Sequence, residues 1–291
     1  MNRLQSRAPA KVNLTLRILA KRADGYHDLV SLVAFAEVGD ELSFVPGARL
    51  DLDMVGRNAA GMGAAGDNLV LIAARALAER IEGLRLGRFD LRKHLPVGAG
   101  LGGGSADAAA ALRLVAEANG LALGDPRLLT AASVVGADVP ACLESKARLV
   151  AGIGERLSPP LLLPPLFAVI AFPGVPLATA AVYGSYDELG PEKPRSPEHP
   201  PSEAIPLERE TFIDFLRSQT NDLAPAARAL APAIAAAEER LRRTPGARLV
   251  RMSGSGSSVF ALYDEPAPAK AAAKAIGAEH ADWWVAATAL R

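Results

Sequence analysis

Five glycines stand close together in the segment LPVGAGLGGGSADAAAAL, residues 95–112, directly before a run of alanines. Glycine loses more conformational freedom on folding than any other residue, so an ordered glycine-rich backbone needs a reason. The segment follows an expected strand and enters an expected helix, and the free N–H groups at a helix N-terminus attract phosphate groups. Glycines also let a ligand approach the backbone without a Cβ in the way. The segment therefore predicts a phosphate-binding loop.

The two common phosphate-binding patterns do not fit this segment. A P-loop requires a lysine after its last glycine, and no lysine follows here. Residues 98–103 are similar to a dinucleotide-binding fingerprint, but the acidic residue expected about 20 positions later, after a second strand, is absent. A flexible linker is a further alternative, and the position between a strand and a strongly helical run argues against it.

Other residues with chemical potential are scattered along the chain. Asp138 lies in GADVP, and a hydroxyl group that attacks phosphorus benefits from a carboxylate that accepts its proton. Asp138 alone is equally well explained as a helix N-cap or turn residue. Lys11 at the start of an alternating strand is ordinarily a solvent-exposed residue, and Tyr26 and His27 follow an ordinary Asp-Gly turn. Each of these residues alone has an ordinary structural explanation, so only their combination can indicate a function.

The elements that must position these residues alternate between strands and helices, which predicts an α/β protein. Strands are expected at 10–19, 29–38, 41–46, 49–55, 89–96, 147–151, 166–173, 248–254, 259–263 and 283–290. Helices are expected at 68–82, 105–118, 126–135, 208–217, 226–242 and 267–276. The second half reads strand, helix, strand, strand, helix, strand, which is a split β-α-β pattern. We expect a domain boundary near residue 153.

The composition limits the classes of partner. The chain has 291 residues and a formal net charge of zero, so no global field attracts nucleic acid or an anionic membrane. The single cysteine, Cys142, excludes an intrachain disulfide and favours a reducing compartment. The longest apolar run, 161–172, is too short to span a bilayer. We expect a cytoplasmic protein that binds a small molecule, as a monomer or a weak homodimer.

Four segments together resemble the GHMP kinases, the superfamily that includes galactokinase, homoserine kinase and mevalonate kinase. Their order and spacing agree with that superfamily, and the similarity covers nearly the whole chain. The segments are the glycine loop with its flanks, PAKVNLTLRILAKRADGYHDL at 9–29, GADVP at 136–140 and RMSGSGSSVFAL at 251–262. The resemblance implies a two-domain α/β fold, with a ribosomal-protein-like domain at 1–153 and a ferredoxin-like domain at 154–291.

The resemblance also implies an activity. The matching member of the superfamily transfers the γ-phosphate of ATP, with Mg²⁺, to a tertiary hydroxyl of a cytidine diphosphate sugar alcohol in non-mevalonate isoprenoid synthesis. Lys11 and Asp138 match its catalytic residues, and a lysine ammonium beside this aspartate would favour the ionised carboxylate. Ser105 is a candidate metal ligand, whereas Asp107 is a candidate by proximity alone and is better explained as a residue of the first helical turn. The residues that match its ATP-binding positions are Pro96, Gly98, Gly100, Leu101, Gly102, Gly103, Gly104 and Ser105.

The resemblance further implies a substrate site. It places Tyr26 on one face of the cytosine, His27 at the polar edge of the base and Tyr183 on the opposite face. The other matching positions are Asn13 near the acceptor alcohol, Thr179, Ser253 and Gly254. One departure is Val33, where some relatives carry a phenylalanine beside the substrate, so the pocket has less aromatic surface here.

Two alternatives remain open at this stage. The first is a GHMP kinase with another acceptor, such as homoserine or mevalonate. The DGYH segment argues against it, because only an enzyme that recognises cytidine has a reason to place an aromatic ring and a ring donor together there. The second is a nucleotide-binding protein of the same fold without catalysis. The presence of both Lys11 and Asp138 argues against that alternative.

Overall fold

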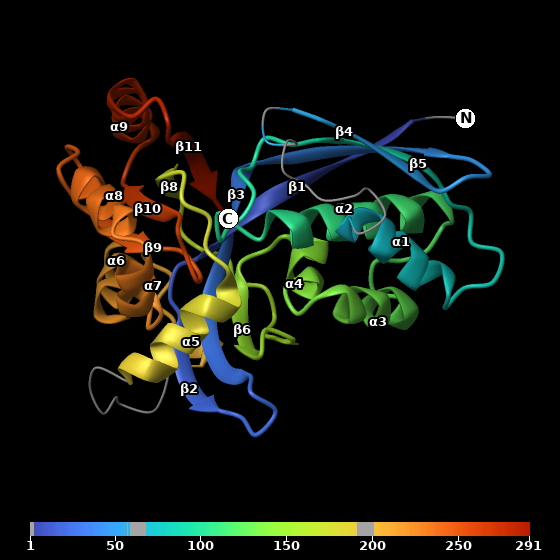
Figure 1. The fold of residues 1–291 in the computed structure, drawn as a ribbon, viewed down its shortest axis with the longest axis horizontal. Helices are drawn as coiled ribbons and strands as arrows, with labels where there is room; N and C mark the ends of the chain where they lie inside the picture. The colour runs from blue at the N-terminus through green and yellow to red at the C-terminus, as the bar shows by residue number, and fades with distance from the viewer. Residues whose placement is uncertain (1–2, 57, 59–67, 191–200) are drawn as a thin grey trace. The chain divides into compact units, whose positions relative to one another are not determined.

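The computed structural model describes residues 3–56, 58, 68–190 and 201–291 (Figure 1). The chain divides into two compact units that interleave along the sequence. Unit 1 comprises Met1–Lys11, Val38–Val97 and Gly102–Ser145; unit 2 comprises Val12–Glu37, Gly98–Leu101 and Lys146–Arg291. The expected two-domain division at residue 153 stays a prediction.

Unit 1 combines strands with four helices on one side of them (Figure 1). β5 pairs with β3 antiparallel and with β4 parallel, and β1 also pairs with β3. The strands are β4 (Asp51–Val55) and β5 (Gly87–Arg92), with the first part of β1 (Leu4–Asn13) and the second part of β3 (His27–Pro46), whose other residues belong to unit 2. The helices are α1 (Leu69–Ala78), α2 (Gly103–Ala118), α3 (Pro126–Val135) and α4 (Val139–Glu144).

One long strand replaces two that the sequence pattern predicts. β3 runs without a break over 20 residues, so the predicted interruption at Gly39 and Asp40 is wrong. Gly39 serves close packing: a Cβ there would lie 2.3 Å from the carbonyl oxygen of Ala8 on β1. Asp40 is buried in the strand and pairs with Lys93. Glycine and aspartate are both typical of turns. Here the close approach of β1 explains the glycine, and the buried lysine explains the aspartate.

The second half of unit 2 forms an antiparallel sheet in the order β11-β8-β10-β9. Chain order is β8, helices, β9, β10, α9 and β11, so the predicted split β-α-β pattern and the α/β class are confirmed. The four strands are β8 (Leu166–Phe172), β9 (Leu249–Met252), β10 (Val259–Tyr263) and β11 (Trp284–Leu290). The remaining strands are β2 (Arg17–Lys21), β6 (Arg148–Gly152) and β7 (Arg156–Leu157).

The helices of unit 2 differ from the predicted ones in two places. The predicted helix 226–242 is divided into α7 and α8 near Pro232, because a proline inside a helix removes a backbone donor. α5 was not predicted. The helices are α5 (Thr179–Leu189), α6 (Arg209–Ser218), α7 (Ala224–Leu230), α8 (Ala233–Arg242) and α9 (Pro266–Glu279), with a short 3₁₀ turn at Ser202–Ala204.

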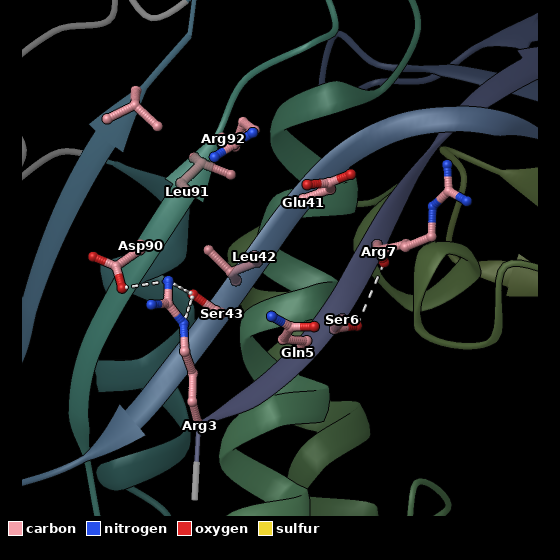
Figure 2. Close-up of a pocket in the computed structure, with 11 residues that line it drawn as sticks. Arg3, Gln5, Ser6, Arg7, Glu41, Leu42, Ser43, Asp90, Leu91 and Arg92 are labelled. Atoms are coloured by element: carbon pink, nitrogen blue, oxygen red, sulfur yellow. Dashed lines mark hydrogen bonds and ion pairs between the residues drawn. The ribbon is translucent and has the colours of Figure 1, made fainter.

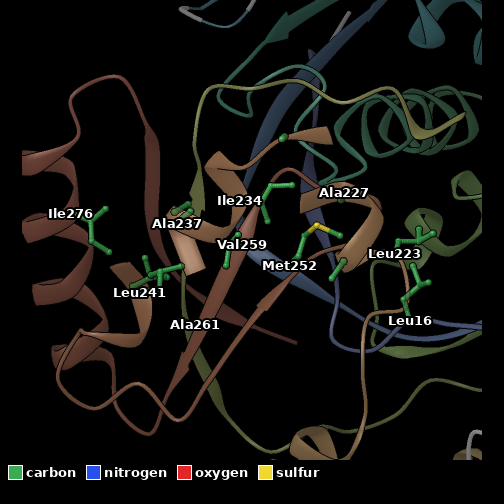
Figure 3. Packing of buried hydrophobic residues seen from close by; sticks show 14 of the residues in the cluster. Leu16, Leu223, Ala227, Ile234, Ala237, Leu241, Met252, Val259, Ala261 and Ile276 are labelled. Carbon is green, nitrogen blue, oxygen red and sulfur yellow. The ribbon is translucent and has the colours of Figure 1, made fainter. Parts of the chain in front are cut away.

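The core of unit 2 lies between this sheet and its helices (Figure 3). Ile234 and Leu241 of α8 are fully buried, as are Val259 and Ala261 of β10. Alternate residues of a strand share one face, which is why Val259 and Ala261 both contribute to this cluster. In the part of the chain that the structure describes, no helix has both the length and the apolar character needed to cross a membrane.

Candidate active site

The glycine loop adopts left-handed backbone before it enters α2. Gly98, Gly100 and Gly102 have φ values of 70°, 74° and 63°, and Gly102 is the N-cap of the helix. The first helical bond runs from the N–H of Ala106 to the carbonyl of Gly102, at 2.8 Å. Among the described residues the N–H groups of Gly103, Gly104 and Ser105 have no acceptor. The first turn of α2 thus presents free donors suited to an anion, as the loop sequence predicts.

The earlier part of the loop, Gly98–Leu101, belongs to unit 2, where it packs against the small-residue loop at 253–258. The N–H of Ser258 donates to the carbonyl of Ala99 at 3.1 Å. A Cβ at Gly100 would lie 2.2 Å from the carbonyl oxygen of Gly256. The two loops therefore approach each other so closely that only glycine fits at position 100.

Lys11 and Asp138 meet in unit 1 although 127 positions separate them. Lys11 Nζ lies 2.6 Å from Asp138 Oδ1, and the lysine is buried whereas the aspartate side chain is 38% exposed. Asp138 occupies the N-cap position of α4, yet its side chain makes no capping bond. The carboxylate is therefore not explained as a helix cap: it is held by a buried cation and stays open to solvent.

The lysine side chain also connects this pair to the glycine loop. A Cβ at Gly102 would lie 3.2 Å from Lys11 Cβ and 3.4 Å from Lys11 Cε. The stem of Lys11 thus runs along the N-cap of α2, beside the free N–H groups of the first turn. Unit 1 by itself brings together a cation, an accessible carboxylate and an anion-binding helix end, which is the set that phosphoryl transfer to an alcohol requires.

Three buried ionisable side chains below the first turn of α2 were not predicted as part of the site. Lys93 Nζ lies 2.7 Å from Asp107 Oδ2 and also donates to Asp40. Asp40 Oδ1 accepts from the N–H groups of His94 and Leu95. Lys93 shares its inward face with Phe89, Leu91 and Leu95, so the alternation of strand 89–96 contains a signal for its burial. The cluster joins β3, the end of β5 and α2 directly beneath the glycine loop.

One lysine cannot neutralise two buried carboxylates. Burial raises the pKa of Asp107 to about 8, opposed by Lys93 and assisted by the charge of Asp40. Burial also opposes the charge of Lys93, but the two carboxylates outweigh it and raise its pKa. Asp107 Oδ1 is buried without a hydrogen-bond partner among the described residues. Asp107 is therefore the member of the cluster that holds a proton near neutral pH.

The raised pKa of Asp107 predicts a pH-dependent stability that Asp107→Asn removes. An aspartate in the unfolded chain titrates near pH 4, so between about pH 4 and pH 8 folding retains a proton that unfolding releases. The stabilisation from the Asp107 carboxyl is complete below the pKa of an aspartate in the unfolded chain, and it is lost as the pH rises through about 8. We expect the free energy of unfolding of Asp107→Asn, relative to wild type, to rise by about 1 kcal/mol or more from pH 5.5 to pH 8.5. Denaturant titrations at pH 5.5 and pH 8.5 measure the free energy of unfolding of both proteins. An equal change in this free energy between the two pH values in wild type and Asp107→Asn would contradict the prediction.

Unit 2 holds Asn13 against the small-residue loop. The N–H of Asn13 donates to Ser253 Oγ at 3.0 Å, and its Nδ2 donates to Ser31 at 2.7 Å. A Cβ at Gly254 would lie 3.2 Å from Asn13 Oδ1. Asn221, which was not predicted, donates to the carbonyls of Met252 and Gly254 at 2.9 and 2.8 Å. The predicted residues Asn13, Ser253 and Gly254 are thus brought together.

The predicted base-binding residues lie on the β2–β3 hairpin and on α5. Tyr26 is 60% exposed and contacts no other ring among the described residues. The ring of His27 is buried and packs on Tyr183, with centroids 4.9 Å apart. Thr179 begins α5 and lies 3.0 Å from Ser255, hydroxyl to hydroxyl. His27 and Tyr183 are therefore in contact, whereas Tyr26 remains a free aromatic surface. Val33 is fully buried on β3, where it pairs with Arg148 of β6.

A groove across β1, β3 and β5 contains none of the predicted site residues (Figure 2). Arg3, Arg7 and Arg92 line it together with Glu41 and Asp90. Arg3 pairs with Asp90 at 2.9 Å, so part of the positive charge is neutralised locally. Among the described residues no cluster of three or more histidine, cysteine or acidic side chains is arranged to hold a metal ion.

Two family models and curated relatives match the chain. Residues 68–146 match the GHMP kinases N terminal domain and residues 207–282 match the GHMP kinases C terminal domain. The chain is 53% identical over 293 residues to the 4-diphosphocytidyl-2-C-methyl-D-erythritol kinase of Xanthobacter autotrophicus, covering all of both chains. It is 50% identical to the kinase of the same name from Azorhizobium caulinodans, again over the full length of both.

Solved structures show the same relationship. A crystal structure of 4-(cytidine 5'-diphospho)-2C-methyl-D-erythritol kinase is similar with a TM-score of 0.77 and 35% identity, covering 99% of both chains. A homoserine kinase from Cytophaga hutchinsonii is similar with a TM-score of 0.70 and 20% identity over 99% of this chain and 95% of its own. The second similarity concerns the fold alone.

Proposed function

The chain belongs to the 4-diphosphocytidyl-2-C-methyl-D-erythritol kinases of the GHMP superfamily, and we propose that it transfers the γ-phosphate of ATP to the 2-hydroxyl of that cytidine diphosphate sugar alcohol. It is a small-molecule kinase that uses ATP. The observation that supports the assignment of its catalytic residues is the Lys11–Asp138 pair, 2.6 Å apart beside the first turn of α2. The proposed product belongs to the non-mevalonate route to isoprenoids.

Asp138 has the geometry of a proton acceptor. Its Oδ1 is occupied by Lys11, and Oδ2 makes no hydrogen bond within the described residues. The side chain is accessible, so an alcohol can donate to the free oxygen and lose its proton as it attacks phosphorus. Lys11 holds the carboxylate in place through their ion pair and places a positive charge where the transferred phosphoryl group gains negative charge.

The triphosphate is proposed to bind at the glycine loop. The free N–H groups of Gly103, Gly104 and Ser105 donate to its oxygens, and Gly98, Gly100 and Gly102 keep side chains out of its way. The proposed role of Pro96 and Leu101 is to shape this loop. The hydroxyl of Ser105, in the first turn of α2, fits a Mg²⁺ ion that is held mainly by the phosphates. Such an ion would neutralise negative charge on the phosphate groups.

The cytidine end is proposed to bind at the β2–β3 hairpin. Tyr26 offers an exposed ring for stacking, and His27 is fixed in place by Tyr183 and by α5. A homoserine or mevalonate acceptor has no base and gives no reason for this pair of rings. The test is a phosphate-transfer assay with ATP, Mg²⁺ and a panel of alcohols. Transfer to the cytidine substrate in preference to homoserine and mevalonate is the expected result, and the reverse preference would overturn the assignment.

Removal of the Tyr26 ring is expected to weaken binding of the cytidine substrate and to leave binding of ATP nearly unchanged. Stacking of a base on an aromatic ring contributes about 1–3 kcal/mol, so KM for the cytidine substrate should rise about tenfold to a hundredfold in Tyr26→Ala. Tyr26→Phe keeps the ring and is the matched control, with KM near the wild-type value. Steady-state kinetics with each substrate varied in turn measures both effects. Equal increases in the two KM values would contradict the stacking role.

A further inference from the structure

His27 is held by a carboxylate that no part of the assignment above uses. Its Nε2 lies 2.7 Å from Asp187 Oδ1, and Asp187 Oδ2 accepts from Lys21 Nζ at 2.6 Å. Lys21 and His27 are direct cross-strand partners at the end of the β2–β3 hairpin. Asp187 comes from α5, so one carboxylate connects that helix to both strands.

The surroundings leave the ring little freedom. Tyr183 packs on its face, and Tyr186 meets it edge-on at 6.1 Å and 83°. The bond to Asp187 is the one hydrogen bond of the ring among the described residues. The hydrogen bonds from Lys21 and His27 hold the pKa of Asp187 below its usual range, so the group is an acceptor at both oxygens.

An acceptor at Nε2 decides where a neutral imidazole carries its proton. The nitrogen that faces the carboxylate must donate, so the proton is on Nε2 and Nδ1 is left as an acceptor. A cytosine presents an amino donor at position 4, whereas a uracil presents a carbonyl acceptor there. An imidazole Nδ1 without a proton accepts a hydrogen bond from the amino group of cytosine. It cannot donate to the carbonyl group of uracil, so the two acceptors repel each other.

We propose that Asp187 is a positioning residue that makes His27 selective for cytosine over uracil by keeping the ring proton on Nε2. This inference rests on the proposed function, in which His27 meets the edge of the base. It concerns the kind of pyrimidine that is accepted, and it assigns the choice to a residue that does not touch the ligand.

The substitution Asp187→Asn offers a sharp test because Lys21 can only donate. The ammonium group takes the single amide oxygen of the asparagine, which turns its NH₂ group toward His27 Nε2. Nε2 must then accept, so the ring proton moves to Nδ1, which now matches uracil. The double variant Lys21→Met/Asp187→Asn frees the amide to turn its oxygen back to Nε2. Lys21→Met alone leaves the carboxylate in place and is the matched control.

The first measurement is the ratio of kcat/KM for the cytidine substrate to that for its uridine analogue, at pH 8.5. A site built to pair with a donor discriminates strongly against an acceptor, and we expect Asp187→Asn to lower this ratio on the order of tenfold or more, through KM. Lys21→Met should keep the wild-type ratio, and the double variant should recover most of it. An unchanged ratio in Asp187→Asn would overturn the inference.

The second measurement is independent of activity. Long-range ¹H–¹⁵N correlation spectra of the histidine rings report which nitrogen carries the proton. The His27 signals should show the Nε2–H form in wild type and Lys21→Met, and the Nδ1–H form in Asp187→Asn. The Nε2–H form in all variants would overturn the inference while the proposed function stands. Wild-type protein that phosphorylates neither nucleotide substrate would refute the proposed function and this inference with it.

Discussion

Asp138→Asn is expected to lower kcat by a hundredfold or more and to leave the KM values for ATP and the alcohol within a few-fold of wild type. The asparagine keeps the shape of the side chain but no longer accepts a proton, and loss of a general base typically has this magnitude. Asp138 makes no capping bond, and the asparagine keeps an oxygen that accepts from Lys11, so the variant should stay folded and lose only the ionic part of its pairing with that buried lysine. Single-turnover and steady-state kinetics, together with thermal unfolding, measure these quantities.

Asp125→Asn is a suitable control for this substitution. Asp125 is the N-cap of α3 and accepts from the N–H of Arg127 at 2.9 Å, so it has the role that Asp138 lacks. Asparagine is a good N-cap residue, and this variant should retain wild-type turnover. If Asp138→Asn also retained turnover within a factor of a few, the assignment of the proton acceptor would be wrong.

Gly100→Ala is expected to reduce kcat/KM for ATP by about a hundredfold. The new Cβ would lie 2.2 Å from the carbonyl oxygen of Gly256, and the φ of 74° is unfavourable for alanine. Backbone atoms cannot give way as a flexible side chain can, so the loop must move away from its neighbour. Misplacement of a positioning group by about 1 Å is enough to reduce a rate about a hundredfold.

Gly120→Ala is a control that introduces backbone strain similar to that of Gly100→Ala without the close contact to another loop. Gly120 follows the C-terminus of α2, has a φ of 67°, and has no atom within 4 Å of the position where a Cβ would lie. It should lose about 1–2 kcal/mol of stability and keep wild-type kinetics. The two variants are compared by ATP-dependent kinetics and by denaturant unfolding. Similar kinetics in both would show that the close approach at position 100 does not matter for the reaction.

The local elements of the site could be predicted because they depend on near neighbours in the chain. The strand, the glycine run and the alanine helix follow from residue types at 89–118, and the structure places the start of α2 two residues before the predicted one. The split β-α-β order of the second half was equally readable. The predictions failed where a tertiary contact overrides a local signal, as at Gly39, which serves packing against Ala8.

The pairings of charged groups could not be predicted from local patterns. Asp107 is typical of a first helical turn exposed to solvent, yet it is buried against Lys93 because two strands and a helix enclose it. Asp187 lies in a stretch with no strong helical pattern, and its partners come from a hairpin more than 150 positions away. Such contacts depend on how elements pack, which the periodicity of one segment does not encode.

The sequence by itself determined the α/β class and the family and predicted a phosphate site at the glycine loop, because each depends on residue types at short spacing or on four ordered motifs. Only the tertiary structure decided that Lys11 holds Asp138, that Lys93 is shared by two buried carboxylates and that Asp187 orients His27. The physical reason is the same in each case. The strength of an ion pair or a hydrogen bond depends on distance and burial, and both are properties of the folded chain.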